Sequence, residues 1–138
     1  MFVTDLAIRK LGRENRWELL SPLIYYIDNL IGECVEVPKG FVTDFASIPF
    51  PFSRIFPPVG KSYDAPSVLH DYLYYMPYVW GWDKKCRQIE RVEADNIYLE
   101  AMVDNRTPLF VRRSIYAGLR MGGWVTWNRY RKGDIIGR

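Results

Sequence analysis

Short apolar stretches, separated by turn-forming residues, fill the first third of the chain. In residues 33–37 polar and apolar side chains alternate with a period of two, the pattern of a strand buried on one face. The same patterning predicts five extended segments, at residues 2–11, 17–20, 23–27, 33–37 and 41–43. We expect antiparallel strands throughout residues 1–45.

Proline dominates the next part of the chain. Four prolines and one glycine fall there: Pro49, Pro51, Pro57, Pro58 and Gly60. Proline lacks the amide hydrogen on which helices and sheet ladders depend, so a long regular element is excluded. We therefore expect residues 46–62 to be a connector.

Beyond the connector, apolar residues recur at intervals of three and four, which is the spacing of helices. Three helices are predicted, at residues 64–76, 87–104 and 108–130. Asp64 is a suitable N-cap for the first helix, and Pro77 ends it. Gly122 and Gly123 weaken the middle of the third helix, because glycine is a poor helix former.

Strands followed by helices indicate an α+β fold. The 138 residues, of which 49% are hydrophobic, suit one domain around one core. We expect a single domain, residues 1–138, with strands in 1–45, the connector in 46–62 and helices in 63–131. No apolar run is long enough to span a bilayer, and residues 1–10 lack the core of a signal peptide, so we expect synthesis in a cytoplasm.

The first predicted helix carries chemically useful side chains beside its apolar face. That face consists of Ala65, Leu69, Leu73 and Met76. His70, the only histidine in the chain, flanks it, and Tyr74 lies on the same side one helical turn later. Asp71 points about 100° further round the helix, toward its polar edge. A histidine and a phenol are thus expected at the border of the core, with an acid just outside it.

The second predicted helix carries an acid within its apolar face. That face consists of Val92, Asp95, Leu99 and Met102. Burying a bare carboxylate costs much free energy, so Asp95 needs a partner, and His70 is the natural candidate. A carboxylate bound to one ring nitrogen fixes the tautomer and lets the other nitrogen act as a general base. A purely structural hydrogen bond is the alternative.

Two further acids are candidates for a site around His70. An exposed Asp71 beside the histidine would suit a hard cation such as calcium. Asp44, which follows the last predicted strand, could be a ligand or a polar wall that faces His70. It could equally cap backbone amides in a turn, as could Ser47.

Several familiar kinds of site are not supported. Zinc hydrolases usually recruit two or three histidines or cysteines, whereas this chain has one histidine and two distant cysteines, Cys34 and Cys86. Ser47 and Ser67 lack a nucleophile-elbow motif, and the chain has no glycine-rich phosphate loop. We expect both cysteines to be free, mostly buried thiols, with one disulfide as the alternative.

Charge is distributed unevenly along the chain, whose formal net charge is +3. Residues 1–105 contain 11 Lys and Arg against 15 Asp and Glu, whereas residues 106–138 contain eight Lys and Arg against one acid. The basic end also holds Trp124, Trp127 and Tyr130. This mixture suits an anionic partner such as a membrane surface, a nucleic acid or an acidic protein. A solvated helix face above aromatic core residues is the alternative.

Three motifs resemble a known family. Residues 37–49 read VPKGFVTDFASIP, residues 70–74 read HDYLY, and Arg91 precedes the pair Ala94-Asp95. Together they resemble a family of short proteins of unknown function from tailed bacteriophages and prophages, and the likeness covers nearly the whole chain. It implies a phage origin, an α+β architecture, and a location in the host cytoplasm or the virion. It supplies no activity.

A second, local resemblance concerns the active-site helices of secreted calcium-dependent phospholipases. His70-Asp71 with Tyr74, and Ala94-Asp95 on the next helix, are similar to those helices. The resemblance implies that His70 is the base, that Asp95 orients it, that Tyr74 steadies Asp95 and that Asp71 binds calcium. Those enzymes also bind calcium through a glycine-rich loop, for which this chain offers only Gly60.

Two classes of function follow as expectations. The first is a small phage-encoded hydrolase, most concretely a calcium-dependent lipid acyl hydrolase whose basic third helix meets an anionic membrane. The second is a non-catalytic virion, tail or assembly protein that binds other phage structural proteins, with the His–Asp pair holding its core. Binding of nucleic acid through residues 106–138 is a weaker third expectation.

Overall fold

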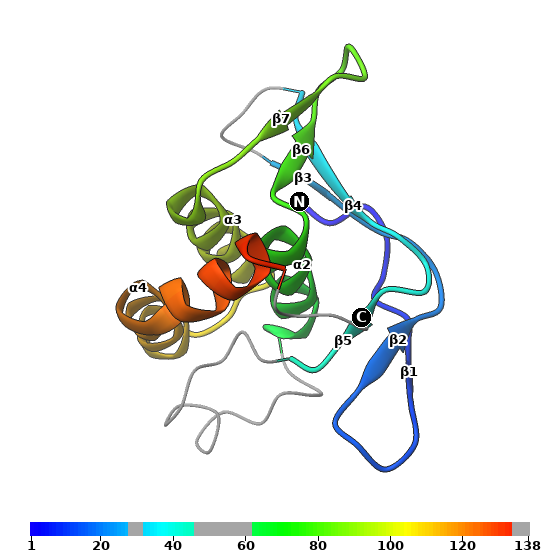
Figure 1. Ribbon diagram of the computed structural model, residues 1–138, viewed down its shortest axis with the longest axis vertical. Coiled ribbons are helices and arrows are strands. Elements are labelled where there is room, and N and C mark those ends of the chain that lie inside the picture. Colours follow the sequence, from blue (N-terminus) through cyan, green and yellow to red (C-terminus); the bar gives the residue numbers. More distant parts are fainter. Residues whose placement is uncertain (28–31, 46–61, 134–138) are drawn as a thin grey trace.

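The computed structural model describes residues 1–27, 32–45 and 62–133. Within this part of the chain, helices gather on one side and β-strands on the other, with α2 (Asp64–Tyr75) between them (Figure 1). Strands dominate the N-terminal third and helices the rest, so the α+β prediction is confirmed.

Two small antiparallel sheets form the strand side. The first has the order β1 (Ile8–Lys10), β2 (Trp17–Leu19) and β5 (Val42–Thr43). The second has the order β3 (Leu23–Tyr26), β4 (Cys34–Val37), β6 (Tyr78–Trp80) and β7 (Cys86–Gln88). In β4 Val35 and Val37 are buried while Glu36 is exposed, which confirms the period of two read from the sequence.

The hairpin of β6 and β7 was not predicted. It occupies the interval between α2 and α3 (Arg91–Asp104), so the second helix begins at Arg91 rather than at residue 87. Every residue of β7 is exposed, and the strand therefore lacks the apolar alternation by which strands are recognised. Backbone pairing with β6 and a tight turn, in which the amide of Gly81 donates to the carbonyl of Lys85, hold it in place.

The other two helices, α2 and α4 (Leu109–Arg131), follow the predicted bounds to within one residue. α2 begins at Asp64 with Tyr63 as its N-cap, so Asp64 is the first helical residue rather than the cap. α4 is continuous through its two central glycines. Two residues were assigned to buried faces wrongly, because Met76 lies just beyond the end of α2 and Val92 lies on the outer side of α3.

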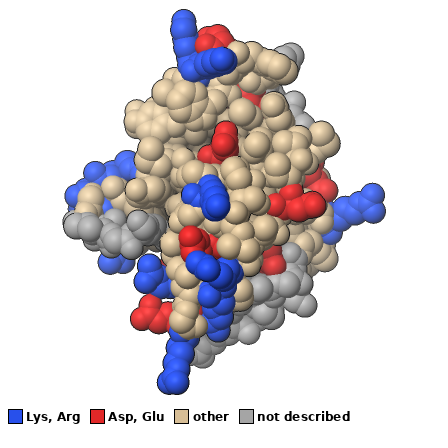
Figure 2. Space-filling model, turned by 90° about the vertical axis from the view of Figure 1, so that its right-hand side faces the viewer, with Lys and Arg blue, Asp and Glu red and all other residues tan. Residues whose placement is uncertain are grey.

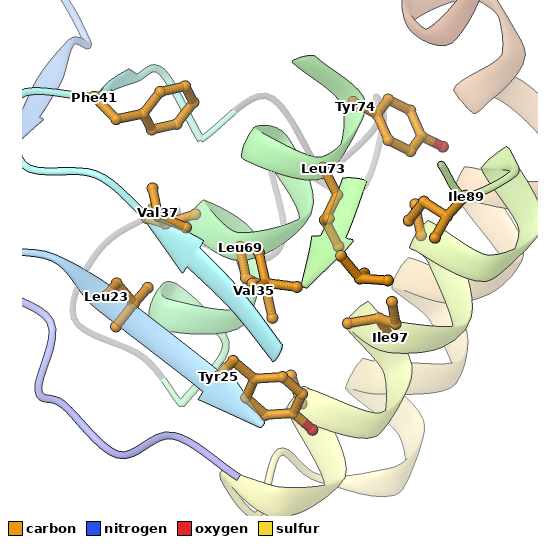
Figure 3. Close-up of a cluster of buried hydrophobic side chains, with 14 of the residues drawn as sticks. Leu23, Tyr25, Val35, Val37, Phe41, Leu69, Leu73, Tyr74, Ile89 and Ile97 are labelled. Atoms are coloured by element: carbon orange, nitrogen blue, oxygen red, sulfur yellow. The ribbon is translucent and has the colours of Figure 1, made fainter. Parts of the chain in front are cut away.

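The core lies where α2 meets β4 and α3 (Figure 3). Leu69 and Leu73 of α2, both fully buried, point toward Val35 of β4, and Ile97 of α3 closes the same cluster. Each such side chain contributes about 1.5–3 kcal/mol through the apolar surface that it removes from water. This packing fixes the separation of α2 and α3, the two helices that carry the site.

Both cysteines are free thiols, as expected, but the expected burial was wrong: Cys34 is half-buried, and Cys86 is exposed because it lies on the open strand β7. Cys34 pairs with Trp80 across one ladder, and Trp80 pairs with Cys86 across the next. The two cysteines are therefore two strand spacings apart, about 9–10 Å. A disulfide needs Cα atoms within about 7 Å, so this sheet keeps the thiols apart.

Candidate functional site

His70 on α2 and Asp95 on α3 form the centre of the site. The Nε2 atom of His70 lies 2.8 Å from Oδ1 of Asp95, and the two side chains are 1% and 0% exposed. The hydrogen bond expected between them is thus present. It forms because both residues lie on the faces along which α2 and α3 pack against each other.

Asp95 is surrounded by four donors. Oδ1 accepts hydrogen bonds from His70 and from the hydroxyl of Tyr74, the latter at 2.6 Å. Oδ2 accepts from Nη1 of Arg120 at 2.6 Å and of Arg91 at 3.4 Å. Burial by itself raises the pKa of Asp95, but the hydrogen bonds from His70, Tyr74 and Arg120 outweigh it and hold the pKa below its ordinary value. Asp95 is therefore an ionised carboxylate inside the core.

The two arginines were not predicted as site residues. Arg91 stands four residues before Asp95 on α3, a spacing at which side chains meet on a helix, so the sequence held a signal for it. Its Nη1 also donates to the carbonyl of Leu119, which ties α3 to α4. Arg120 comes from α4, and no local spacing relates it to Asp95.

Tyr74 is a hydrogen-bond donor in this site. Burial and the hydrogen bond to Asp95 raise the pKa of its phenol well above the ordinary value, so the hydroxyl keeps its proton. Its ring lies 4.2 Å from the ring of His70, and the edge of Trp127 on α4 contacts it at 5.3 Å, both measured between centroids. Tyr74 thus links all three helices of the site.

Contacts with Tyr98 also hold the ring of His70 in place. The ring of Tyr98 stacks on the imidazole with centroids 4.7 Å apart. Its hydroxyl lies 2.7 Å from Oγ of Ser67, which in turn donates to the carbonyl of Tyr63. All of these side chains are buried, so the orientation of the imidazole is fixed by packing as well as by Asp95.

Asp71 does not lie at a polar edge, as the sequence suggested. It is 4% exposed, and its Oδ2 accepts a hydrogen bond of 2.8 Å from the hydroxyl of Thr43. The short strand β5 packs against α2 and covers this side of the helix. The expectation of an exposed acid was wrong because helical geometry alone does not reveal a strand packed on the helix.

Asp44, the neighbouring candidate, is exposed. Its carbonyl accepts a hydrogen bond from the side chain of Asn15 at 3.0 Å. The hydroxyl oxygen of Thr43, the residue before Asp44, accepts a hydrogen bond from the amide of Phe45 at 3.1 Å and so caps this turn. The other two loop candidates, Ser47 and Gly60, lie outside the described residues.

The described residues do not by themselves complete a calcium site. Calcium binds about six to eight oxygen ligands, several of them carboxylates. Asp71 offers one carboxylate, part of which is engaged by Thr43. Within residues 1–27, 32–45 and 62–133, no group of three or more His, Cys, Asp or Glu side chains is arranged to hold a metal.

Fold and site together define an α+β protein with a buried His–Asp pair braced by a tyrosine and two arginines. The sequence model of a family described as "Protein of unknown function (DUF1353)" matches residues 17–119, and the chain belongs to this family. The match includes His70, Tyr74 and Asp95 but ends one residue before Arg120. No curated protein and no solved structure matches the chain significantly.

Proposed function

We propose that the protein is a hydrolase in which His70 is the general base and a lipid ester is the substrate. The hydrogen bond of 2.8 Å between His70 Nε2 and Asp95 carries this proposal. Because Asp95 is ionised, Nε2 bears the proton that it donates. In the proposed mechanism His70 starts as the neutral imidazole, whose lone pair is then on Nδ1. Nδ1 is therefore the atom that would accept a proton from water.

The reaction follows from these roles. Water loses a proton to Nδ1 of His70 while its oxygen attacks the ester carbonyl. Asp95 stabilises the imidazolium that forms, and Tyr74 holds Asp95 in place. Collapse of the tetrahedral intermediate breaks the bond to the alcohol oxygen, which takes the proton back from His70. The products are a carboxylic acid and an alcohol.

The local resemblance to calcium-dependent phospholipases supports the choice of substrate. It implied that the second-helix aspartate orients the histidine and that the tyrosine steadies this aspartate, and both contacts occur here. Calcium is part of the same proposal: Asp71 would be one of its ligands, on the side of α2 where β5 packs. The family resemblance in the sequence motifs leads us to propose a phage origin as well.

A non-catalytic role in a phage particle or its assembly is the second candidate. The burial of His70, which is 1% exposed, favours it. So does the number of donors around Asp95, because a fully satisfied buried network is also a means of fixing one packing arrangement. Recovery of the protein in purified particles, with no ester hydrolysis, would support this role.

The deciding experiment is release of fatty acid from anionic phospholipid vesicles by wild type and His70→Gln. The glutamine amide can still donate to Asp95 but cannot act as a base, so His70→Gln separates chemistry from packing. We expect release by wild type and a loss of about 100-fold or more in His70→Gln with the fold intact. Added calcium and added chelator test the metal, and Asp83→Asn, in the exposed turn between β6 and β7, is the matched control.

Two results would reject the proposal. If wild type releases no fatty acid with calcium or with chelator, the protein is not this hydrolase. If His70→Gln releases fatty acid as fast as wild type, His70 is not the base. Equal release of fatty acid with calcium and with chelator would support the hydrolase activity but show that it does not need calcium.

A further inference from the structure

The outward side of α4 is apolar and exposed. We define the α4 outer face by five residues: Leu109, Phe110, Met121, Trp124 and Val125. Phe110 is 75% exposed, Met121 81% and Trp124 54%. Single exposed apolar side chains are common, but a contiguous group of large ones often marks a surface that meets a partner.

These residues do not belong to the core. Ile115, Leu119 and Tyr130, on the inner side of α4, are buried against the rest of the protein. Phe110, Met121 and Trp124 recur at intervals of eleven and three residues, which is one stripe on the opposite side. α4 therefore has an inner apolar side that packs and an outer apolar side that the described residues leave open.

Positive charge borders the α4 outer face. Arg113, Arg129 and Lys132 are exposed beside it, and residues 105–133 contain no acid at all. Other parts of the surface are different: on the face in Figure 2, acidic and basic side chains are interspersed among neutral ones. An exposed apolar stripe on a helix whose charged residues are all cationic complements a surface that is both apolar and negative.

We infer that the α4 outer face binds the surface of an anionic bilayer. Helices that lie in a membrane interface bury Trp, Phe and Leu among the lipid chains and direct Lys and Arg toward the headgroups, and α4 has these features. Trp124 and Phe110 are the anchoring side chains, and Arg113 and Arg129 face the lipid phosphates. No helix in the described part of the chain is long and apolar enough to cross a membrane, which accords with binding at the surface.

This inference deepens the proposed function, because it names a bilayer as the location of the ester substrate. Only that link to the substrate rests on the proposed function. Binding itself does not require catalysis. His70 and Asp95 lie on α2 and α3, whereas the α4 outer face points away from them, so the two properties can be removed separately.

The test is co-sedimentation with vesicles of phosphatidylcholine alone and of phosphatidylcholine mixed with phosphatidylglycerol. We expect wild type to bind the anionic vesicles at least tenfold more tightly, with an affinity that falls as salt is added. Met121→Asp with Trp124→Asp should lower the affinity at least tenfold. The control is Val92→Asp with Val103→Asp, since both valines are exposed apolar residues on another helix, α3, at 43% and 47%.

Three results would overturn the inference. One is equal binding of wild type to neutral and anionic vesicles, or no binding to either. Another is wild-type affinity in the Met121→Asp, Trp124→Asp variant while its circular dichroism shows an intact fold. The third is a wild-type dimer that this variant converts to a monomer, because a second copy of the chain would then cover the face.

A water-soluble short-chain ester separates this inference from the proposed function. If the α4 variant loses vesicle binding but still cleaves the soluble ester, both proposals hold. If wild type binds anionic vesicles through α4 and cleaves neither kind of ester, the proposed hydrolase activity is rejected and membrane binding by α4 is supported. If wild type cleaves the soluble ester but does not bind vesicles, membrane binding is rejected and the hydrolase is supported.

Discussion

Gly123 of α4 lies directly against the hydroxyl of Tyr74 on α2. A Cβ atom at Gly123 would lie 2.6 Å from that oxygen and 3.3 Å from Nη1 of Arg91. Both groups bind Asp95, so the absence of a side chain at this position lets α4 approach the carboxylate closely. The adjacent Gly122 faces open space, with nothing within 4 Å of an added Cβ.

The glycine pair gives a matched test of this contact. We expect Gly123→Ala to lower the free energy of unfolding by about 1–3 kcal/mol, because the methyl group would displace the Tyr74 hydroxyl or Arg91. Gly122→Ala should instead raise it by about 0.5–1 kcal/mol, since alanine is the better helix former. Urea unfolding of both variants checks the prediction. Equal effects of the two substitutions would show that the approach of α4 to Tyr74 is not tight.

Tyr74→Phe removes one donor from Asp95 and keeps the ring contacts with His70 and Trp127. A lost hydrogen bond to a buried charge costs about 1.5–3 kcal/mol, and we expect a loss of stability in this range. Tyr75→Phe, on the same helix but with a partly exposed ring, is the control and should change the stability by less than about 0.5 kcal/mol. Thermal unfolding followed by circular dichroism compares the two.

The central pair could be predicted from sequence because two local rules converge on it. Helical spacing placed Asp95 on an apolar face, and the cost of burying a carboxylate required a donor nearby. His70, on the border of the preceding helix, was the natural candidate, and the bond of 2.8 Å confirms this pairing.

Contacts between distant parts of the chain could not be read in the same way. Arg120 reaches Asp95 from α4 and Thr43 reaches Asp71 from β5, and in neither case does a helical or strand period connect the partners. The hairpin of β6 and β7 escaped prediction for another reason. Its second strand is exposed throughout, so backbone pairing forms it without any apolar signal.

Acid should weaken the fold through Asp95. Its pKa is lower in the folded protein than in the unfolded chain, so its contribution to stability is complete above the unfolded value of about 4 and is lost as the pH falls through the folded value. We expect stability to decline more steeply with acid in wild type than in Asp95→Asn. Urea unfolding at about pH 7 and about pH 3 measures the change in stability with pH for wild type and for Asp95→Asn. The other acids are the same in both proteins, so a difference between the two changes is due to Asp95. Parallel slopes would contradict the lowered pKa.

Asp95→Asn should also be costly at neutral pH. The substitution leaves Arg91 and Arg120, whose side chains are 19% and 33% exposed, without their carboxylate. Since solvent partly screens these charges, we expect a loss of about 1.5–3 kcal/mol, the cost of a hydrogen bond to a charged group. Asp83→Asn, in the exposed turn between β6 and β7, is the control and should have a small effect. Urea unfolding at neutral pH gives both values. A loss below about 1 kcal/mol in Asp95→Asn would mean that the network around Asp95 is not tightly coupled.

Thr43 and Asp71 give the last prediction, because their hydrogen bond joins β5 to α2 beside the histidine. Thr43→Val keeps the shape of the side chain but removes the donor from a carboxylate that is 4% exposed. We expect a loss of about 1–3 kcal/mol in the free energy of unfolding. Asp71→Asn should cost less in a Thr43→Val background than in wild type, since the two residues share one interaction, and a double-mutant cycle by urea unfolding measures this coupling. Strictly additive losses would mean that Thr43 and Asp71 stabilise the protein independently, and that β5 does not hold the carboxylate against α2.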